Sequence, residues 1–213
     1  MRVIIVGAGG HGQVVADSMM RAHECGAAAR PVGYLDDDPA VAGRSFLGLP
    51  VLGPVSRWSE IPHDAMVVAI GENRIRKRLF QMMAHHGAKF AVVRHPSAVI
   101  APDVLIGPGS MICAGAVVNP GSVIGANVIL NTGCIVDHHN RIGDHVHIAP
   151  GVRLGGDVSI EEGVLVGIGA TVMPQRQVGA WGIVGASALV HRDVPQGSMA
   201  VGVPARLRKG TRS

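Results

Sequence analysis

The feature that most restricts the fold is a six-residue repeat in the second half of the chain. Counting in steps of six from Ile100 to Val190, all sixteen positions hold Ile, Val or Leu. Glycine often follows the aliphatic residue, and the residue two places before it is usually small, as a tight corner requires. Six residues make one flat side and a turn, so a three-sided coil takes about 18 residues. The repeat therefore predicts a parallel β-helix of about five coils over residues 98–193.

The residues before 98 follow a different pattern, in which strands alternate with helices. Residues 3–6 form an apolar strand, residues 7–12 read GAGGHG, and residues 13–25 have helical spacing of apolar side chains. Further strands are expected at 31–35, 66–70 and 89–93, with a helix at 74–86. The expected fold is an α/β half-Rossmann domain over residues 1–95, followed by a β-helix domain over residues 96–213.

The GAGGHG motif allows three interpretations. Its glycines suit the approach of a phosphate to a helix N-terminus, which NAD and nucleotide diphosphates both present, and they also suit close packing alone. About 95 residues leave no room for a second mononucleotide-binding half, so a nucleotide diphosphate is favoured over NAD. Ligands of parallel sheets bind at the carboxyl ends of strands, here near Gly9, Asp36 and Gly71.

Composition limits the possible partners. Aromatic residues make up 3% of the chain, too few to form a stacking platform for nucleic acid. No apolar stretch approaches the ~20 residues of a membrane span, and no signal peptide is evident, so a cytoplasmic protein without membrane or nucleic-acid partners is expected. The basic cluster between Arg74 and Arg78 favours small anionic ligands or a solvated face. Three cysteines without paired spacing are expected to be reduced and inert.

Six sequence segments occur in an order that resembles a known family. They are VGAGGHG, GYLDDDP, AIGENRIR, HPSAVI, NTGCIVDHH within the repeats, and GVPAR at the end. This order resembles the sialic acid O-acetyltransferase (NeuD-like and PglD-like) family of hexapeptide-repeat sugar acyltransferases. The resemblance implies a left-handed β-helix, acetyl-CoA as cosubstrate without a metal, a nucleotide-linked sugar as substrate, and a homotrimer with active sites between subunits.

The resemblance also assigns roles to individual residues. It implies that His138 is the general base, that His147 lies near the thioester, and that Asn131 holds the substrate. The implied substrate-binding residues are Gly9, Gly10, His11, Gly12, Asp36, Asp37 and Gly71. The implied coenzyme A groove comprises His147, Gly156, Gly167, Ile168, Gly169, Ala170, Gly202, Pro204 and Arg206.

One residue departs from the family pattern. Where the family's triplet ends in a carboxylate that orients the histidine, this chain has His139. A carboxylate on the far imidazole nitrogen fixes the tautomer and stabilises the imidazolium, so its loss must be compensated or the base weakened. Asp137, Asp144 or a backbone carbonyl are the candidates for compensation. A weaker base is better tolerated with an amine acceptor than with a hydroxyl, which favours N-acetylation of a UDP-, GDP- or dTDP-linked 4-amino sugar.

Three alternatives stay open. The first is O-acetylation of a sialic-acid-type sugar, and the second is a non-catalytic nucleotide-binding β-helix trimer. The third is a zinc site, since four histidines fall between His138 and His147, and strand alternation would place His145 and His147 on one side. Cys134 occupies the small inward position of the repeat, which disfavours a nucleophilic role.

Overall fold

A computed structural model describes residues 1–208 of the chain. It consists of two compact units: the first is Met1–Pro96 and the second begins at Ser97. Among the described residues, no helix combines the length and apolar character that a membrane span needs.

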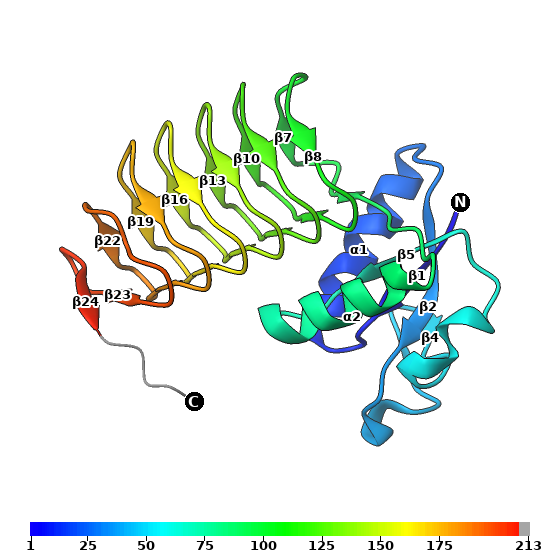
Figure 1. The fold of residues 1–213 in the computed structure, drawn as a ribbon. Coiled ribbons are helices and arrows are strands. Elements are labelled where there is room, and N and C mark those ends of the chain that lie inside the picture. Colours follow the sequence, from blue (N-terminus) through cyan, green and yellow to red (C-terminus); the bar gives the residue numbers. More distant parts are fainter. Residues whose placement is uncertain (209–213) are drawn as a thin grey trace. The chain divides into compact units, whose positions relative to one another are not determined.

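The first unit is built on a three-stranded parallel sheet. Its strands lie in the order β2 (Arg30–Leu35), β1 (Arg2–Val6), β5 (Ala65–Val68), and the helices are α1 (Gly10–Glu24) and α2 (Asn73–His85) (Figure 1). The remaining elements are the 3₁₀ turns η1 (Pro39–Val41) and η2 (Val55–Ser59) and the strands β3 (Ser45–Phe46), β4 (Leu49–Pro50) and β6 (Val93–Arg94). The expected α/β fold with parallel strands is confirmed.

The core of this unit explains why the apolar strands pair. Ile4, Val6, Leu35 and Met66 are fully buried, and α2 contributes Met83 to the same cluster. Burying an aliphatic side chain of this size stabilises the fold by about 1.5–3 kcal/mol. Because the three strands are parallel, their carboxyl ends lie at one edge of the sheet, where Leu35 and the glycine-rich loop after Val6 lie.

The second unit is a three-faced β-helix made of two-residue strands. The first face stacks β7 (Val99–Ile100), β10 (Val117–Val118), β13 (Ile135–Val136), β16 (Arg153–Leu154), β19 (Thr171–Val172) and β22 (Leu189–Val190) (Figure 1). The second face stacks β8 (Leu105–Ile106), β11 (Val123–Ile124), β14 (Arg141–Ile142), β17 (Ser159–Ile160) and β20 (Gln177–Val178). The third face contains β9 (Met111–Ile112), β12 (Ile129–Leu130), β15 (His147–Ile148), β18 (Leu165–Val166), β21 (Ile183–Val184) and β23 (Met199–Val201).

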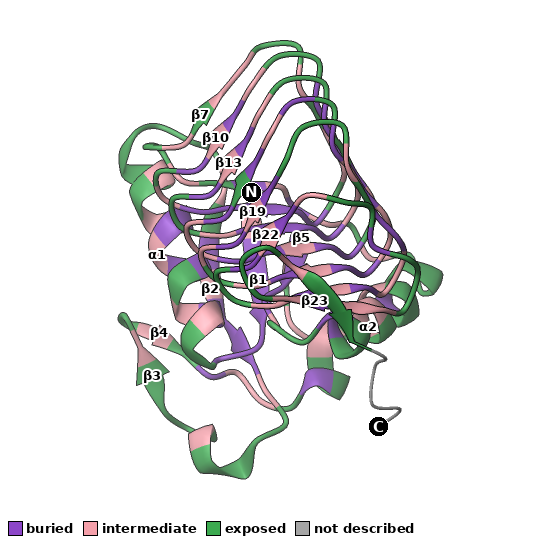
Figure 2. Ribbon diagram, turned by 90° about the vertical axis from the view of Figure 1, so that its left-hand side faces the viewer, coloured by how far each residue is buried: buried purple, intermediate pink, exposed green. Residues whose placement is uncertain are grey.

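Neighbouring strands on each face are parallel and in strict register. On the first face Val118 pairs with Val136, and on the second Ile124 pairs with Ile142, an 18-residue step in both cases. Fourteen of the sixteen repeat aliphatics are buried, and only Ile100 and Ile106 in the first coil are half-buried. Figure 2 shows the buried positions recurring from coil to coil. The repeat side chains thus form the continuous core that the sequence predicted.

The helix continues past the repeat. Val194 bridges to Val178 on the second face, and β23 follows on the third, so β22, Val194 and β23 form a sixth coil. β24 (Arg206–Arg208) then turns back antiparallel to β23. The repeat predicted five coils because this last coil lacks the regular aliphatic spacing.

Polar side chains inside some corners connect consecutive coils. Asn140 Nδ2 donates to the Gly155 carbonyl at 3.0 Å, and Asn140 Oδ1 accepts from the Val158 backbone amide at 3.0 Å. Ser122 Oγ accepts from the Asn140 backbone amide at 3.2 Å. These bonds satisfy buried backbone groups at the turn that carries His138.

Candidate active site

Two corners of the β-helix carry the residues assigned to catalysis. The His138 corner comprises the turns between the first and second faces, residues 119–122, 137–140 and 155–158 in successive coils. The Asn131 corner comprises the turns between the third and first faces, residues 131–134, 149–152, 167–170 and 185–188.

At the His138 corner two imidazole rings share a hydrogen bond. His138 Nδ1 lies 3.0 Å from His139 Nδ1, and both residues are exposed. Their ring planes meet at 78°, with centroids 5.1 Å apart. One nitrogen must donate and the other accept at this distance. The partner of the His138 ring is therefore His139, the residue that departs from the family pattern.

Asp137 and Asp144, the two candidates to replace the orienting carboxylate, form hydrogen bonds with other groups. Asp137 Oδ1 accepts from the backbone amide of His138 and from Asn119 Nδ2, each at 2.8 Å. The Asn119 hydrogen bond, followed by the backbone bond, lowers the pKa of Asp137. Asp144 Oδ1 accepts from the Ala126 amide at 2.7 Å, in a turn between the second and third faces. Asp137 therefore fixes the backbone of His138 rather than its ring.

Two glycines make room for the histidine rings. A methyl group at Gly156 would overlap the His138 ring, and one at Gly121 would overlap the His139 ring. Each histidine thus lies against the backbone of a neighbouring coil. The structure gives Gly156, assigned to the coenzyme A groove, a packing role beside the proposed base.

The Asn131 corner and the adjacent third face bring a second group together. Asn131 Nδ2 donates to His147 Nε2 at 3.2 Å, and Asn131 Oδ1 accepts from the Thr132 amide at 2.8 Å. The second bond fixes the amide orientation, so His147 Nε2 is an acceptor and its proton resides on Nδ1. His147 is half-buried on β15.

Most of the residues assigned to coenzyme A follow the same corner. Residues 167–170 lie two coils beyond residues 131–134, and the Ile168 side chain is 61% exposed. The Gly202 carbonyl accepts from the Leu189 amide at 3.0 Å, and the Ala205 amide donates to the Leu189 carbonyl at 2.8 Å. These bonds attach the segment containing Gly202 and Pro204 to β22, while Arg206 lies exposed in β24.

Within one chain the two groups lie at opposite ends of one side. Residues 131–134 precede β13 and residues 137–140 follow it. A side of six extended residues spans up to about 20 Å. His138 and Asn131 therefore lie at different corners of one chain.

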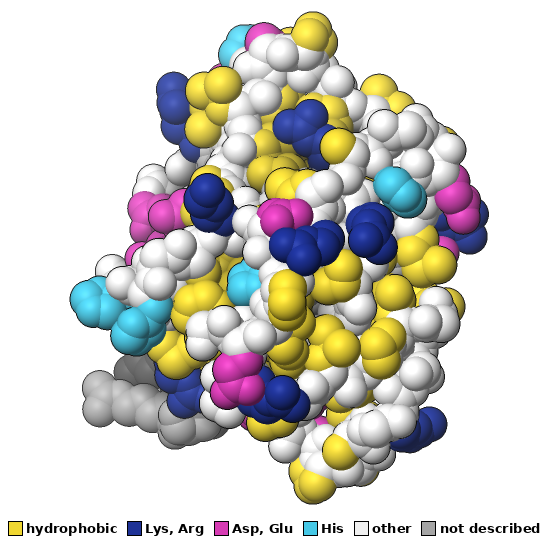
Figure 3. Space-filling view, turned by 90° about the vertical axis from the view of Figure 1, so that its right-hand side faces the viewer, with side chains coloured by type: hydrophobic (Ala, Val, Ile, Leu, Met, Phe, Trp, Pro, Cys, Tyr) yellow, Lys and Arg dark blue, Asp and Glu magenta, His cyan; other side chains and the backbone are white. Residues whose placement is uncertain are grey.

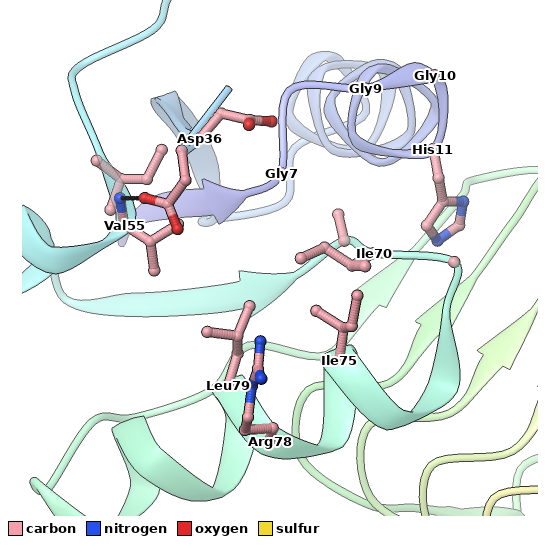
Figure 4. Close-up of a pocket in the computed structure, with 14 residues that line it drawn as sticks. Gly7, Gly9, Gly10, His11, Asp36, Val55, Ile70, Ile75, Arg78 and Leu79 are labelled. Atoms are coloured by element: carbon pink, nitrogen blue, oxygen red, sulfur yellow. Dashed lines mark hydrogen bonds between the residues drawn. The ribbon is translucent and has the colours of Figure 1, made fainter. Parts of the chain in front are cut away.

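The first unit contains a cavity of about 420 Å³ at the carboxyl ends of its strands. Its lining includes six of the seven residues assigned to substrate binding: Gly9, Gly10, His11, Asp36, Asp37 and Gly71 (Figure 4). Gly12 does not line it. A methyl group at Gly12 would overlap the Gly7 carbonyl oxygen, so this glycine allows α1 to pack against the end of β1.

The two aspartates in the cavity differ in function. Asp36 Oδ2 accepts from the Ala8 amide at 2.7 Å, and its Oδ1 accepts from the Asp38 amide at 2.9 Å. Asp37 Oδ1 accepts from the Val55 amide at 2.8 Å, the dashed line in Figure 4. Asp36 thus binds the glycine-rich loop with one oxygen and the turn after β2 with the other. Asp37 keeps one oxygen available to a ligand.

Residues of α2 and the preceding loop complete the cavity, and the motif alone did not identify them. Ile70, Ile75 and Leu79 form an apolar wall, and Arg78 lies beside them (Figure 4). The buried guanidinium of Arg76 donates to the Ile70 carbonyl at 3.0 Å, and burial lowers its pKa to about 10. Within the basic cluster noted in the sequence, Arg76 thus supports the loop and Arg78 lines the cavity.

On the face shown in Figure 3, basic, acidic and apolar side chains are intermixed in small groups. In the cavity lining, Arg78 provides positive charge that could attract a phosphate.

The histidines of the zinc alternative are dispersed. His145 is buried and its Nδ1 lies 2.9 Å from Asn127 Nδ2, at a corner between the second and third faces. His147 lies on β15, so the two residues do not lie on one strand, as the alternation argument assumes. Among the described residues, one group of three brings possible ligand atoms within 4.8 Å of one another: His138, His139 and Asp157.

Comparisons with known proteins agree with this architecture. The family model of the PglD N-terminal domain matches residues 2–83. The GDP-perosamine N-acetyltransferase of Escherichia coli O157:H7 is 31% identical over 214 residues, covering 96% of this chain and 95% of the relative. The UDP-N-acetylbacillosamine N-acetyltransferase of Bacillus subtilis (strain 168) is 38% identical over 109 residues, and this match spans about half of each protein: 50% of this chain and 49% of the relative.

Solved structures match over nearly the whole chain. PerB from Caulobacter crescentus, in complex with CoA and GDP-perosamine, has a TM-score of 0.88 and 39% identity, covering 98% of this chain and 97% of that one. Variants of the Caulobacter enzyme with a histidine replaced by Asn or Ala were solved with the same two ligands. The acetyltransferase domain of PglB from Neisseria gonorrhoeae FA1090, in complex with acetyl coenzyme A, has a TM-score of 0.89 and 37% identity, covering 97% and 98%.

Fold, cavity and family agree. This chain belongs to the family of acetyl-CoA-dependent nucleotide-sugar N-acetyltransferases, in which an α/β domain precedes a left-handed β-helix.

Proposed function

We propose that the protein transfers the acetyl group of acetyl-CoA to the amino group of a nucleotide-linked 4-amino sugar, with His138 as general base. The assignment of the base rests on one observation: the His138 ring is exposed, and its Nδ1 is hydrogen-bonded to His139. Nε2 is thereby left to meet an incoming amine. The Caulobacter variants with a replaced histidine and bound CoA and GDP-perosamine support a histidine with a chemical role.

The transfer takes place directly between the two substrates. The sugar nitrogen attacks the thioester carbonyl carbon while His138 Nε2 accepts the amine proton, the C–S bond breaks, and the proton passes to the leaving sulfur. Cys134 takes no part, because burial raises its pKa to about 12 and keeps the thiol protonated. His147, on the third face, is assigned to the thioester side, where its Nδ1–H can donate to the developing oxyanion.

The nucleotide of the acceptor sugar is assigned to the cavity of the first unit. Apolar walls from Ile75 and Leu79 suit a base, the start of α1 and Arg78 suit phosphates, and Asp37 can accept from a base or ribose. His11 projects from the first turn of α1, with its ring pointing away from that helix (Figure 4).

We test the reaction by identifying the product. The protein is incubated with acetyl-CoA and GDP-, UDP- or dTDP-linked 4-amino sugars, and the acetylated sugar is examined by NMR before and after mild alkali. An alkali-stable acetamide on one amino sugar is the expected result. An alkali-labile ester on a hydroxyl of the sugar would instead establish O-acetylation.

The separation of the two corners supports a homotrimer with active sites between subunits. The first face carries an outward apolar row in consecutive coils: Val99, 64% exposed, followed by Val117 and Ile135. Such a row suits contact with another copy. A neighbouring chain can then bring its Asn131 corner to the His138 corner of the first.

Subunit mixing tests this arrangement. His138→Asn and Asn131→Ala proteins are each expected to be nearly inactive, because each lacks one half of every site. Unfolding and refolding them together is expected to restore part of the wild-type rate, since some interfaces then combine two intact halves. A mixture as inactive as its components, or a wild-type protein that sediments as an active monomer, would contradict a shared site.

A further inference from the structure

We propose that Asp157, one coil beyond His139, is the carboxylate that positions the base, in a relay His138–His139–Asp157. This rests on the proposed role of His138. The carboxylate missing from position 139 has then not been lost but is supplied from the next coil, and His139 is the link to it.

The β-helix register places these residues together. Gly121, His139 and Asp157 occupy the same corner position in three consecutive coils, 18 residues apart. His139 and Asp157 both have a left-handed backbone, with φ of 58° and 57°, and the Asp157 amide donates to the His138 carbonyl at 3.0 Å. A carboxylate oxygen of Asp157 and a ring nitrogen of each histidine all lie within 4.8 Å of one another.

The contact between the rings leaves two possible proton positions. With the proton on His138 Nδ1, His139 Nδ1 accepts it and His138 Nε2 carries the lone pair that a base needs. With the proton on His139 Nδ1, a neutral His138 carries its other proton on Nε2 and cannot accept one there. His139 acts as a positioning residue only in the first arrangement.

Asp157 can stabilise the charged state that forms when His138 takes up a proton. When Nε2 takes the amine proton, the ring pair becomes a cation that shares the proton between the two Nδ1 atoms, and a nearby carboxylate lowers its energy. Asp137 is the other carboxylate facing His138, and its Oδ1 is held by Asn119 and the His138 amide. Asp103, two coils before His139 in the same column, accepts from the Gly121 amide at 2.7 Å. Asp157 is thus the carboxylate that lies within 4.8 Å of a ring nitrogen of each histidine.

The chain offers substitutions that preserve the backbone. Asp and Asn tolerate positive φ, so Asp157→Asn and His139→Asp suit their corners. In His139→Asp, a carboxylate oxygen takes the place of His139 Nδ1, because both atoms are two bonds from Cβ. That variant supplies the negative charge directly to His138 and makes Asp157 dispensable.

The test is a double-mutant cycle on the full-length protein. Asp157→Asn alone is expected to lower kcat about tenfold to a hundredfold, with KM for both substrates within about twofold. The same substitution in a His139→Asp background is expected to change kcat by less than about twofold. Gln175→Asn, in the same column one coil further, is the matched control and is expected to leave kcat unchanged.

Other outcomes overturn the relay. An equal loss of kcat in both backgrounds would mean that Asp157 acts only on the fold. Loss of wild-type activity on adding a chelator would place a metal ion, rather than a proton, between the three side chains.

A second readout does not depend on turnover. In ¹⁵N spectra of histidine-labelled protein, with the signals assigned through His139→Asn, His138 is expected to be protonated at Nδ1 in its neutral form. A neutral His138 protonated at Nε2 overturns the relay even in an active enzyme. If the protein gives the expected spectrum but acetylates no amino sugar, the relay is supported and the proposed function is contradicted. The two failures are therefore distinguishable.

Discussion

Replacing His138 with Asn is expected to lower kcat by about three orders of magnitude, because a positioned general base contributes roughly 10²- to 10⁴-fold. The amine still reaches the thioester, but no group accepts its proton. Binding of coenzyme A is expected to stay within about twofold of wild type, since most residues assigned to that groove lie at the other corner. Steady-state kinetics and calorimetric titration with coenzyme A measure the two effects separately.

His85→Asn is the matched control. It removes an exposed histidine at the end of α2 and is expected to leave both kcat and coenzyme A binding unchanged. A His138→Asn protein that retains a tenth or more of the wild-type kcat would contradict the assignment of the base.

Replacing Gly12 with Ala is expected to destabilise the first unit by roughly 2–4 kcal/mol. The added methyl group would overlap the Gly7 carbonyl oxygen, a backbone atom that cannot move without displacing α1 from β1. Thermal unfolding monitored by circular dichroism, with the free energy of unfolding taken from denaturant titration, measures the effect. The nucleotide affinity falls only as the cavity distorts, because Gly12 does not line it.

Gly10→Ala tests whether the effect is specific. Gly10 is in the same motif and lines the cavity, yet a methyl group there meets no atom within 4 Å. This variant is expected to change the free energy of unfolding by less than about 0.5 kcal/mol. Equal destabilisation by the two substitutions would contradict the packing role of Gly12.

The fold was predictable from the sequence because its repeat and its core are the same residues. A period of six, with Ile, Val or Leu at each step, leaves few alternatives to a three-sided coil. The β3–β4 hairpin was missed, since two-residue strands separated by Leu47 and Gly48 have no alternation to detect. The sixth coil was missed because Val194 and Ala200 depart from the six-residue step.

The site was predictable only in part, because side chains meet across coils rather than along the chain. Asn119 and Asp137 are 18 residues apart, as are His139 and Asp157, so counting in coil lengths would have found both pairs. Closeness in sequence, in contrast, does not imply closeness in the β-helix. His138 and Asn131 are seven positions apart in the sequence, yet a turn, a strand and a turn place them at different corners.

Glycine roles could not be read from the motif. The motif GAGGHG contains glycines of two kinds: Gly9 lines the cavity, whereas Gly12 allows α1 to pack on β1. Only the surroundings of each position separate the two roles.

The most direct test of the central claim is the release of coenzyme A thiol from acetyl-CoA with UDP-, GDP- and dTDP-linked 4-amino sugars as acceptors. We expect steady release with one of these amino sugars, and its loss in His138→Asn. Acetyl-CoA that binds without thiol release on any amino sugar, or release that is equally fast in His138→Asn, would contradict acetyl transfer by this site.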